Sequence, residues 1–164
     1  MWKKPLGILV ILVSFSVPVF AAIPRDRMHI GGLKPGMTLQ QVAAMYGMPQ
    51  KVKSPSKDAV GMYDIAGGLI SGWIDSKINA FTRYSINEEQ EGSGRINASG
   101  DIYIGMPVSE VERNLGKPDA VGGNGKSLSY FYHSVDRGLA GREHDSLNVF
   151  FNDGEVRTIA INVF

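Results

Sequence analysis

The feature that most constrains the fold is a short motif that occurs twice in the chain. The first copy spans residues 36–49 and the second spans 105–118, so the second begins 69 residues after the first (105 − 36). Both copies read Gly-Met, then a Val five residues after the Met, a Gly five residues further on, and a Pro two residues after that Gly. Such a repeat indicates that the chain folds as two copies of one structural unit.

The first copy predicts a helix over 39–46. Thr38 suits the N-cap, and Gln41 three residues later completes a capping box. Gly47 lies where a helix needs a left-handed residue to end, and Pro49 prevents its continuation. The apolar residues fall on one helix face, at Leu39, Val42, Ala43 and Tyr46.

The second copy predicts a helix over about 108–115. It keeps an apolar face at Val108, Val111 and Leu115, and it keeps the stop signals as Gly116 and Pro118. It differs at the start, where Pro107 replaces the capping Thr. Proline is tolerated at the first helical position because its missing N–H would be unpaired there anyway.

Three strand-like runs follow each helix. Residues 50–59 and Gly122–Lys126 have the composition of turns, and the acidic, Gly-containing residues 87–100 indicate a flexible linker. The predicted fold is therefore α+β: two tandem repeats, at 22–86 and 101–164, each a short helix packed on its own three-stranded antiparallel sheet. The predicted strands are Val60–Ala66, Leu69–Asp75, Ile78–Ile86, Ser127–His133, Ser146–Asn152 and Glu155–Phe164.

The first 21 residues have the pattern of a secretory signal peptide. Lys3 and Lys4 precede an apolar run from Leu6 to Phe20, and Val19-Phe20-Ala21 suits cleavage after Ala21. The alternative is a membrane anchor, but the run is about 15 residues and a span needs about 20. We therefore expect a periplasmic or secreted protein with no transmembrane segment after cleavage.

The charge balance and the lack of cysteine exclude several kinds of binding and of covalent chemistry. Cleavage would leave 143 residues (164 − 21), with 15 basic and 16 acidic side chains once the two lysines are gone, a balance that predicts no nucleic-acid binding. The chain has no cysteine, which excludes disulfides, thiol chemistry and a lipid anchor on an N-terminal Cys.

No set of residues meets the requirements of catalysis or of cofactor binding. Gly125-Lys126-Ser127 ends like a phosphate-binding loop, but Ala120 stands where the earlier Gly is required. His133 and His144 lie near acidic residues, yet no HxxxH or HxH spacing supports a metal site. No Gly-x-Ser-x-Gly occurs. We predict a protein that is not an enzyme and has no metal or cofactor; a small enzyme or ligand carrier is the alternative that an apolar pocket between the repeats would favour.

The motif and its strands resemble the SmpA/OmlA family. The resemblance lies in Gly36-Met37-Thr38-x-Gln40-Gln41-Val42-Ala43 with Gly47-x-Pro49, in the aromatic strand Tyr130-Phe131-Tyr132, and in the last hairpin, 147–156. That family includes the small accessory lipoprotein of the outer-membrane β-barrel assembly machine. Two such units in tandem are similar in arrangement to the secreted β-lactamase inhibitory protein. The assembly subunit usually has one copy and a lipidated Cys, and the inhibitor is disulfide-bonded; this chain has two copies and no Cys. The resemblance implies a binding role in the cell envelope or outside the cell.

Consecutive aromatics indicate where binding would occur. If Tyr130 and Tyr132 face the helix, Phe131 points outward, where it is either covered by the other repeat or part of a recognition surface. The segment Ser134–Asp145 adds about nine residues to the second repeat, because Asp75 and Asp153 are offset by 78 rather than 69 (153 − 75), and long loops commonly carry recognition. We predict an exported, non-catalytic module that binds an envelope or secreted protein, or alternatively an inhibitor of an enzyme such as a β-lactamase. The candidate binding residues are Trp73, Phe131, His133, Arg137, Arg142, His144 and Phe150.

Overall fold

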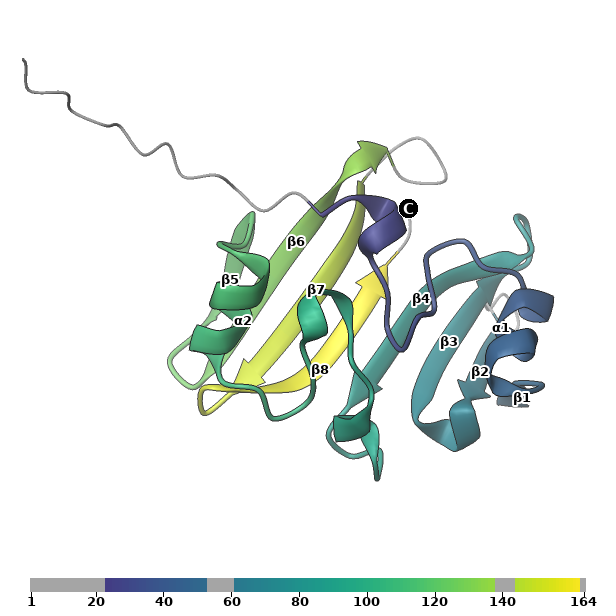
Figure 1. Ribbon diagram of the computed structural model, residues 1–164, viewed down its shortest axis with the longest axis horizontal. Coiled ribbons are helices and arrows are strands. Elements are labelled where there is room, and N and C mark those ends of the chain that lie inside the picture. Colours follow the sequence, from purple (N-terminus) through teal and green to yellow (C-terminus); the bar gives the residue numbers. More distant parts are fainter. Residues whose placement is uncertain (1–22, 53–60, 138–143, 163–164) are drawn as a thin grey trace, which may run out of the picture.

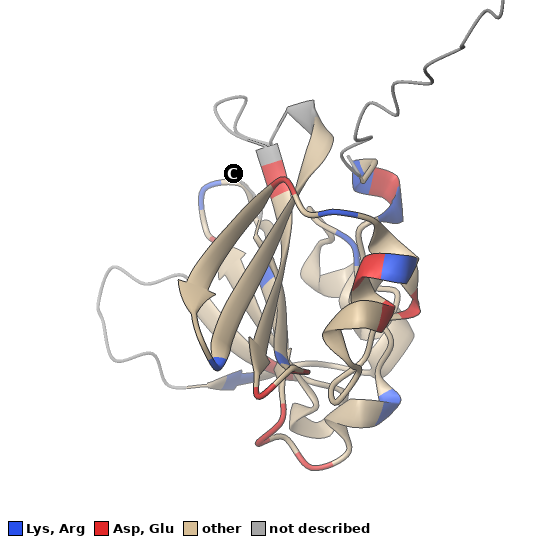
Figure 2. Ribbon diagram, turned by 90° about the vertical axis from the view of Figure 1, so that its left-hand side faces the viewer, with Lys and Arg blue, Asp and Glu red and all other residues tan. Residues whose placement is uncertain are grey.

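A computed structural model describes residues 23–52, 61–137 and 144–162; the predicted signal peptide lies outside them. The described residues form one antiparallel sheet of eight strands, with two α-helices and short 3-10 turns on one of its faces (Figures 1 and 2). The first half contains α1 (Leu39–Tyr46), β1 (Gln50–Val52), β2 (Gly61–Ile65), β3 (Ile70–Asp75) and β4 (Ala80–Asn87). The second half contains α2 (Val108–Leu115), β5 (Ala120–Asn124), β6 (Ser127–Arg137), β7 (His144–Asn152) and β8 (Glu155–Asn162).

The prediction of two separate three-stranded sheets is wrong. The strand order is β1-β2-β3-β4-β8-β7-β6-β5, so the last strand of each half pairs with the last strand of the other. The β4–β8 ladder runs from Arg83↔Asn162 to Asn87↔Thr158. Unpaired backbone N–H and C=O groups make an exposed strand edge costly, and this pairing removes two such edges at once.

Two strands were predicted as turns. β1 has only three residues and β5 contains Gly122 and Gly123, so neither shows an apolar alternation. They are strands because they pair with the stronger strands beside them, β1 with β2 and β5 with β6. Each half therefore contributes four strands rather than three, and β1 and β5 form the two outer edges of the sheet.

Both helices begin and end close to where the motif predicts. Thr38 and Gln41 form the capping box of α1: the Gln41 N–H donates to Thr38 Oγ1 at 3.3 Å, and the Thr38 N–H donates to Gln41 Oε1 at 2.8 Å. The residues after α1 and α2, Gly47 and Gly116, both have φ of 79°. Pro107 lies one residue before α2 rather than at its first position, and no side chain caps that helix.

The core lies between the sheet and the helices. Val42 of α1 and Val111 of α2 are fully buried there. On the sheet, Phe81 stacks on Tyr84 with ring centroids 5.2 Å apart, and Tyr130 meets the edge of Phe151 at 4.9 Å. We call this side of the sheet the inner face. It carries most of the fully buried aromatic and branched residues, including the laterally adjacent Tyr84, Ile161, Leu147 and Tyr132.

The segments that precede the two helices pair with each other. The Gly31 N–H donates to the carbonyl of Asn97 at 2.8 Å, and the Ser99 N–H donates to the carbonyl of His29 at 3.0 Å. The predicted linker thus contains residues with defined partners: Ala98 and Ser99 are buried, and Gln90 donates from Nε2 to the carbonyl of Gly68 at 2.8 Å. These contacts join the halves on the helix side of the sheet.

The start of the described chain packs against the second half. The Ile23 N–H donates to the carbonyl of His133 at 3.3 Å, on the part of β6 that extends beyond its pairing with β5. The turn Arg25–Arg27 then places Arg25 against Asp145 of β7, whose side chain is fully buried, and the two form an ion pair. The first described residues therefore stabilise two of the last strands in the sequence, β6 and β7.

Candidate functional site: the outer face of the sheet

The sheet face opposite the helices is the candidate site, and we call it the outer face. In Figure 2 both helices and the 3-10 turns lie on one side of the strands, and no described helix covers the other side. The strand registers place one residue of every strand side by side across this face. In order from β1 to β5, that row is Gln50, Asp64, Ser71, Ser85, Ala160, Asn148, Phe131 and Ala120.

A second row runs parallel to the first. It contains Met62, Trp73, Arg83, Asn162, Ser146 and His133. The middle of the outer face thus consists of small or short side chains, and the large ones stand to either side. Ser71, Ser85, Ala160, Asn148 and Ser146 are between 1% and 8% exposed, since little of a short side chain remains accessible between larger neighbours.

Aromatic side chains form a pair on each side of this centre. On the first-half side, the guanidinium carbon of Arg83 lies 4.7 Å from the centre of the Trp73 ring, a cation–π contact. On the second-half side, Phe131 and Phe150 meet edge to face, with centroids 6.3 Å apart and an interplanar angle of 85°. Trp73, Phe131 and Phe150 are all half-buried. The two halves lie edge to edge, so neither covers the outward aromatics of the other.

His133 is exposed and lies on the same face next to Asp119. Its backbone N–H donates to Asp119 Oδ2 at 2.6 Å, and its ring nitrogen Nδ1 is 3.7 Å from the same oxygen. Arg137 and His144 pair where the β6–β7 hairpin resumes, and Arg142 lies outside the described residues. The structure thus brings Phe131, His133 and Phe150 together on two adjacent strands and places Trp73 across the sheet from them.

Two residues of this face were missed by the sequence reasoning. Asn148 lies between the buried Leu147 and Val149, and a polar residue between two inward apolar ones must point outward, so its direction was predictable. Arg83 gave a weaker signal, because the half-buried Thr82 precedes it at a register shift in the β3–β4 ladder. What could not be read was that Arg83 lies directly across from Trp73.

The inner face contains tyrosines whose chemistry is structural. Burial, followed by a hydrogen bond of 2.5 Å to Glu112 of α2 and the charge of that carboxylate, raises the pKa of Tyr130 to about 12. Burial also raises the pKa of Tyr132, whose hydroxyl donates to the carbonyl of Gly116 at 3.2 Å. Neutral phenols in these places tie the sheet to α2 rather than exchange protons at neutral pH.

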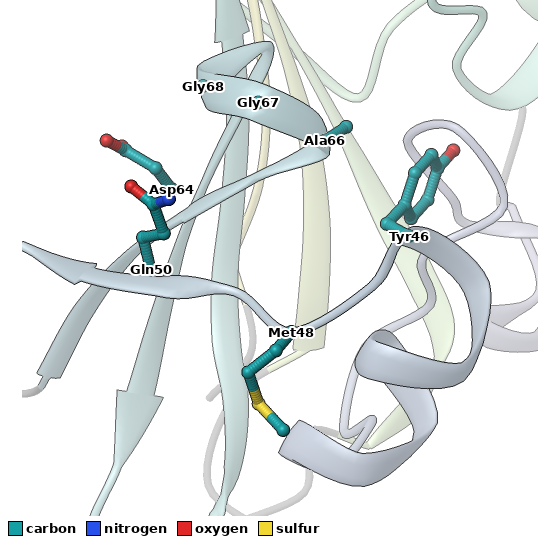
Figure 3. Close-up of a pocket in the computed structure, with 7 residues that line it drawn as sticks. All are labelled: Tyr46, Met48, Gln50, Asp64, Ala66, Gly67 and Gly68. Carbon is teal, nitrogen blue, oxygen red and sulfur yellow. The ribbon is translucent and has the colours of Figure 1, made fainter.

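A small pocket opens near the edge of the first half. It has a volume of about 250 Å³ and is lined by Tyr46, Met48, Gln50, Asp64 and 66–68 (Figure 3). Gln50 and Asp64 are cross-strand neighbours, whereas Tyr46 comes from the end of α1. Its size falls below the range of roughly 300–1,000 Å³ typical of small-molecule sites, so we do not base a function on it. Among the described residues no group of three or more His, Asp or Glu side chains is placed to hold a metal ion.

Comparisons with known proteins find a structural neighbour but no matching family. No protein-family model matches the chain, and no curated protein matches it either. A crystal structure of a DUF4309 family protein (YjgB) from Bacillus subtilis is similar over 77% of this chain and 78% of that one, with 14% identity and a TM-score of 0.45. Similarity at that level assigns neither a family nor a function. None of the described helices is long and apolar enough to cross a membrane.

Proposed function

We propose that this chain is an exported, non-catalytic module that binds another protein of the cell envelope or the extracellular space through the outer face of its sheet. The observation that carries the proposal is the placement of Trp73, Phe131 and Phe150, half-buried on a face that no described helix covers. Aromatic residues are enriched among the residues that dominate binding energy at protein interfaces. The resemblance to the SmpA/OmlA family supports the same class of function.

The chemistry of the face favours a protein partner. Rigid aromatic side chains stand beside short Ser, Ala and Asn side chains, so a partner's backbone can approach the middle of the sheet closely. The basic side chains in the two rows, Arg83 and His133, are single and well separated and form no basic stripe. Nucleic-acid interfaces are far more positively charged than this.

Site-specific photo-cross-linking in the native host tests the proposal. A photoreactive phenylalanine analogue at Phe131 or Trp73 should cross-link to a discrete protein, identified by mass spectrometry. The same analogue at Arg113, exposed on α2, is the matched control and should give no such product. Barrel-assembly components would support the assembly role, and a secreted hydrolase would support the inhibitor alternative. Cross-links from Arg113 but not from Phe131 or Trp73 would contradict binding through the outer face.

Export is tested separately. Cleavage after Ala21 predicts that the purified protein has the intact mass of residues 22–164. A full-length species retained in the inner membrane would contradict it. The part of the predicted site that includes Arg142 stays a prediction, which shortening of residues 135–144 to a two-residue Asn-Gly turn would test.

A further inference from the structure

Arg83 is a cation on the outer face with no acidic partner among the described residues. Among the described residues, no carboxylate oxygen lies within the 4.0 Å that defines an ion pair with it. Arg157, by contrast, holds Glu88 at 2.7 Å and Glu155 at 3.2 Å. Stacking on Trp73 orients the Arg83 guanidinium while leaving its N–H edge unpaired by any described carboxylate. A guanidinium held in this way is suited to a planar carboxylate, which it binds with two parallel hydrogen bonds.

Asn148 carries a buried acceptor atom that no described residue pairs with a donor. The residue is 8% exposed, and its Oδ1 has no hydrogen-bond partner among the described residues. Phe131 lies directly across from it on β6, and Phe150 follows two residues later on the same face. Leaving an acceptor buried and unpaired costs stability, and such groups are rare in native structures. A donor from a bound partner would satisfy this one.

The two groups are separated by a distance that a partner can match. Arg83 is on β4 and Asn148 is two strands away on β7, one row along, which places their Cα atoms about 12 Å apart by ordinary strand spacings. The residues between them include Ser85 and Ala160, which leave room for a chain to pass over the sheet. An extended segment of three or four residues spans about that distance.

We propose that the outer face recognises a loop of its partner protein that brings an Asp or Glu carboxylate to Arg83 and, two strands away, an N–H donor to Asn148 Oδ1. The inference rests on the proposed function and names the chemistry of the partner. Because Oδ1 is buried in the free protein, side chains around Asn148 have to move before the donor reaches it. Phe131 and Phe150 then cover the new hydrogen bond and keep water from it.

The test uses a phage-displayed library of disulfide-constrained 12-residue loops, selected on the purified chain and depleted on the Arg83→Gln, Asn148→Leu double variant. Most enriched loops should contain Asp or Glu. Arg83→Gln should weaken their binding by about tenfold, and added salt should weaken the wild-type complex more than the variant complex. Asn148→Leu should weaken binding by at least about fivefold without lowering the melting temperature, because it removes an acceptor that the free fold leaves unpaired. Asn148→Asp, which keeps the acceptor, should retain more of the binding than Leu.

Controls and contrary outcomes keep the test sharp. Arg113→Gln on α2 and Asn152→Leu at the exposed end of β7 should leave binding unchanged. The inference fails if no loop distinguishes the wild type from the double variant, if acidic residues are not enriched, or if Asn148→Leu lowers the melting temperature, which would make Asn148 structural. It also fails, while the proposed function stands, if the cross-linked partner binds the double variant normally but is lost by Phe131→Ala. Both fall if Phe131→Ala and Trp73→Ala keep full binding as well.

Discussion

The two halves of the molecule share a scaffold and differ in what is built on it. In each half a glycine with positive φ lies directly against the last residue of the helix: Gly31 against Tyr46, and Gly100 against Leu115. The two glycines are 69 residues apart (100 − 31), and so are their partners (115 − 46). The 69-residue correspondence therefore extends five residues before the motif (36 − 31), into the segments that pair with each other between the halves.

The differences lie at the ends of elements and on the outer face. α1 has a capping box and α2 has none. The ion pair of Arg25 with Asp145 holds the N-terminal segment against the start of β7. The outer face carries Trp73 with Arg83 on one side and Phe131 with Phe150 on the other. Positions packed between helix and sheet tolerate little change, whereas no described helix constrains the outer face, so divergence there is where recognition can arise.

The largest expected effect concerns the ion pair of Arg25 with Asp145, which joins the N-terminal segment to β7 of the second half. Arg25→Met should lower the free energy of unfolding by about 3 kcal/mol, because it leaves the buried Asp145 carboxylate without its charged partner. Urea unfolding measures the loss. The double variant Arg25→Met, Asp145→Leu should recover most of it, since no buried charge remains. Equal stability of Arg25→Met and wild type would show that the N-terminal segment does not secure the second half.

The next largest effect is expected at the glycine that contacts the end of α2. Gly100→Ala should cost about 2 kcal/mol, because its φ is left-handed and the new Cβ would lie 2.4 Å from a methyl of the buried Leu115. Gly67→Ala has nearly the same backbone angles (φ 71° and ψ 27°, against 69° and 22° at Gly100) but meets nothing within 4 Å, so it should cost only about 1 kcal/mol. Thermal unfolding of both, with Gly94→Ala as a control at an ordinary φ, checks the ranking. Similar losses of stability at all three positions would contradict a close contact between Gly100 and Leu115.

Substitutions at the two helix N-caps should change stability in opposite directions. Thr38→Ala removes the cap of α1 and should cost about 1 kcal/mol. Pro107→Thr offers a cap to α2 in a backbone conformation that already suits one, with φ of −65° and ψ of 146°, and should stabilise by up to about 1 kcal/mol. Denaturant midpoints of the two variants compare directly. Destabilisation by Pro107→Thr would mean that the proline's rigidity matters more than a cap.

The smallest effect is a pH dependence at His29, which has no histidine counterpart in the second half, where Ala98 stands 69 residues later (98 − 29). Burial first, and then the charge of Lys34, lower the pKa of His29 in the folded state, against the opposing effect of Asp101. Its Nδ1 also accepts from the Gly32 N–H at 3.3 Å, which requires that nitrogen to be unprotonated. Since the folded pKa lies below the ordinary 6.5, this contribution is present above pH 6.5 and is lost as the pH falls through the folded pKa. His29→Gln should reduce the fall in melting temperature between pH 7 and 5. If the fall is unchanged, the pH dependence comes from other groups.

The sequence by itself determined the local features. Thr38, Gln41, Gly47 and Gly116 set the helix ends through contacts within a few residues, and strand alternation was enough to direct Phe131 outward. These features depend on backbone conformation and on neighbours in the chain, so their signals are short and readable.

Only the tertiary structure decided how the halves join and what the outer face contains. The pairing of β4 with β8 is a contact between strands about 75 residues apart. It satisfies edge N–H and C=O groups that every strand possesses, so no side-chain pattern in the sequence predicts it. The same pairing makes Trp73–Arg83 and Phe131–Asn148–Phe150 parts of one continuous face. Which side chains meet across a sheet depends on register between distant strands, and register is settled by packing of the whole core rather than by any one strand.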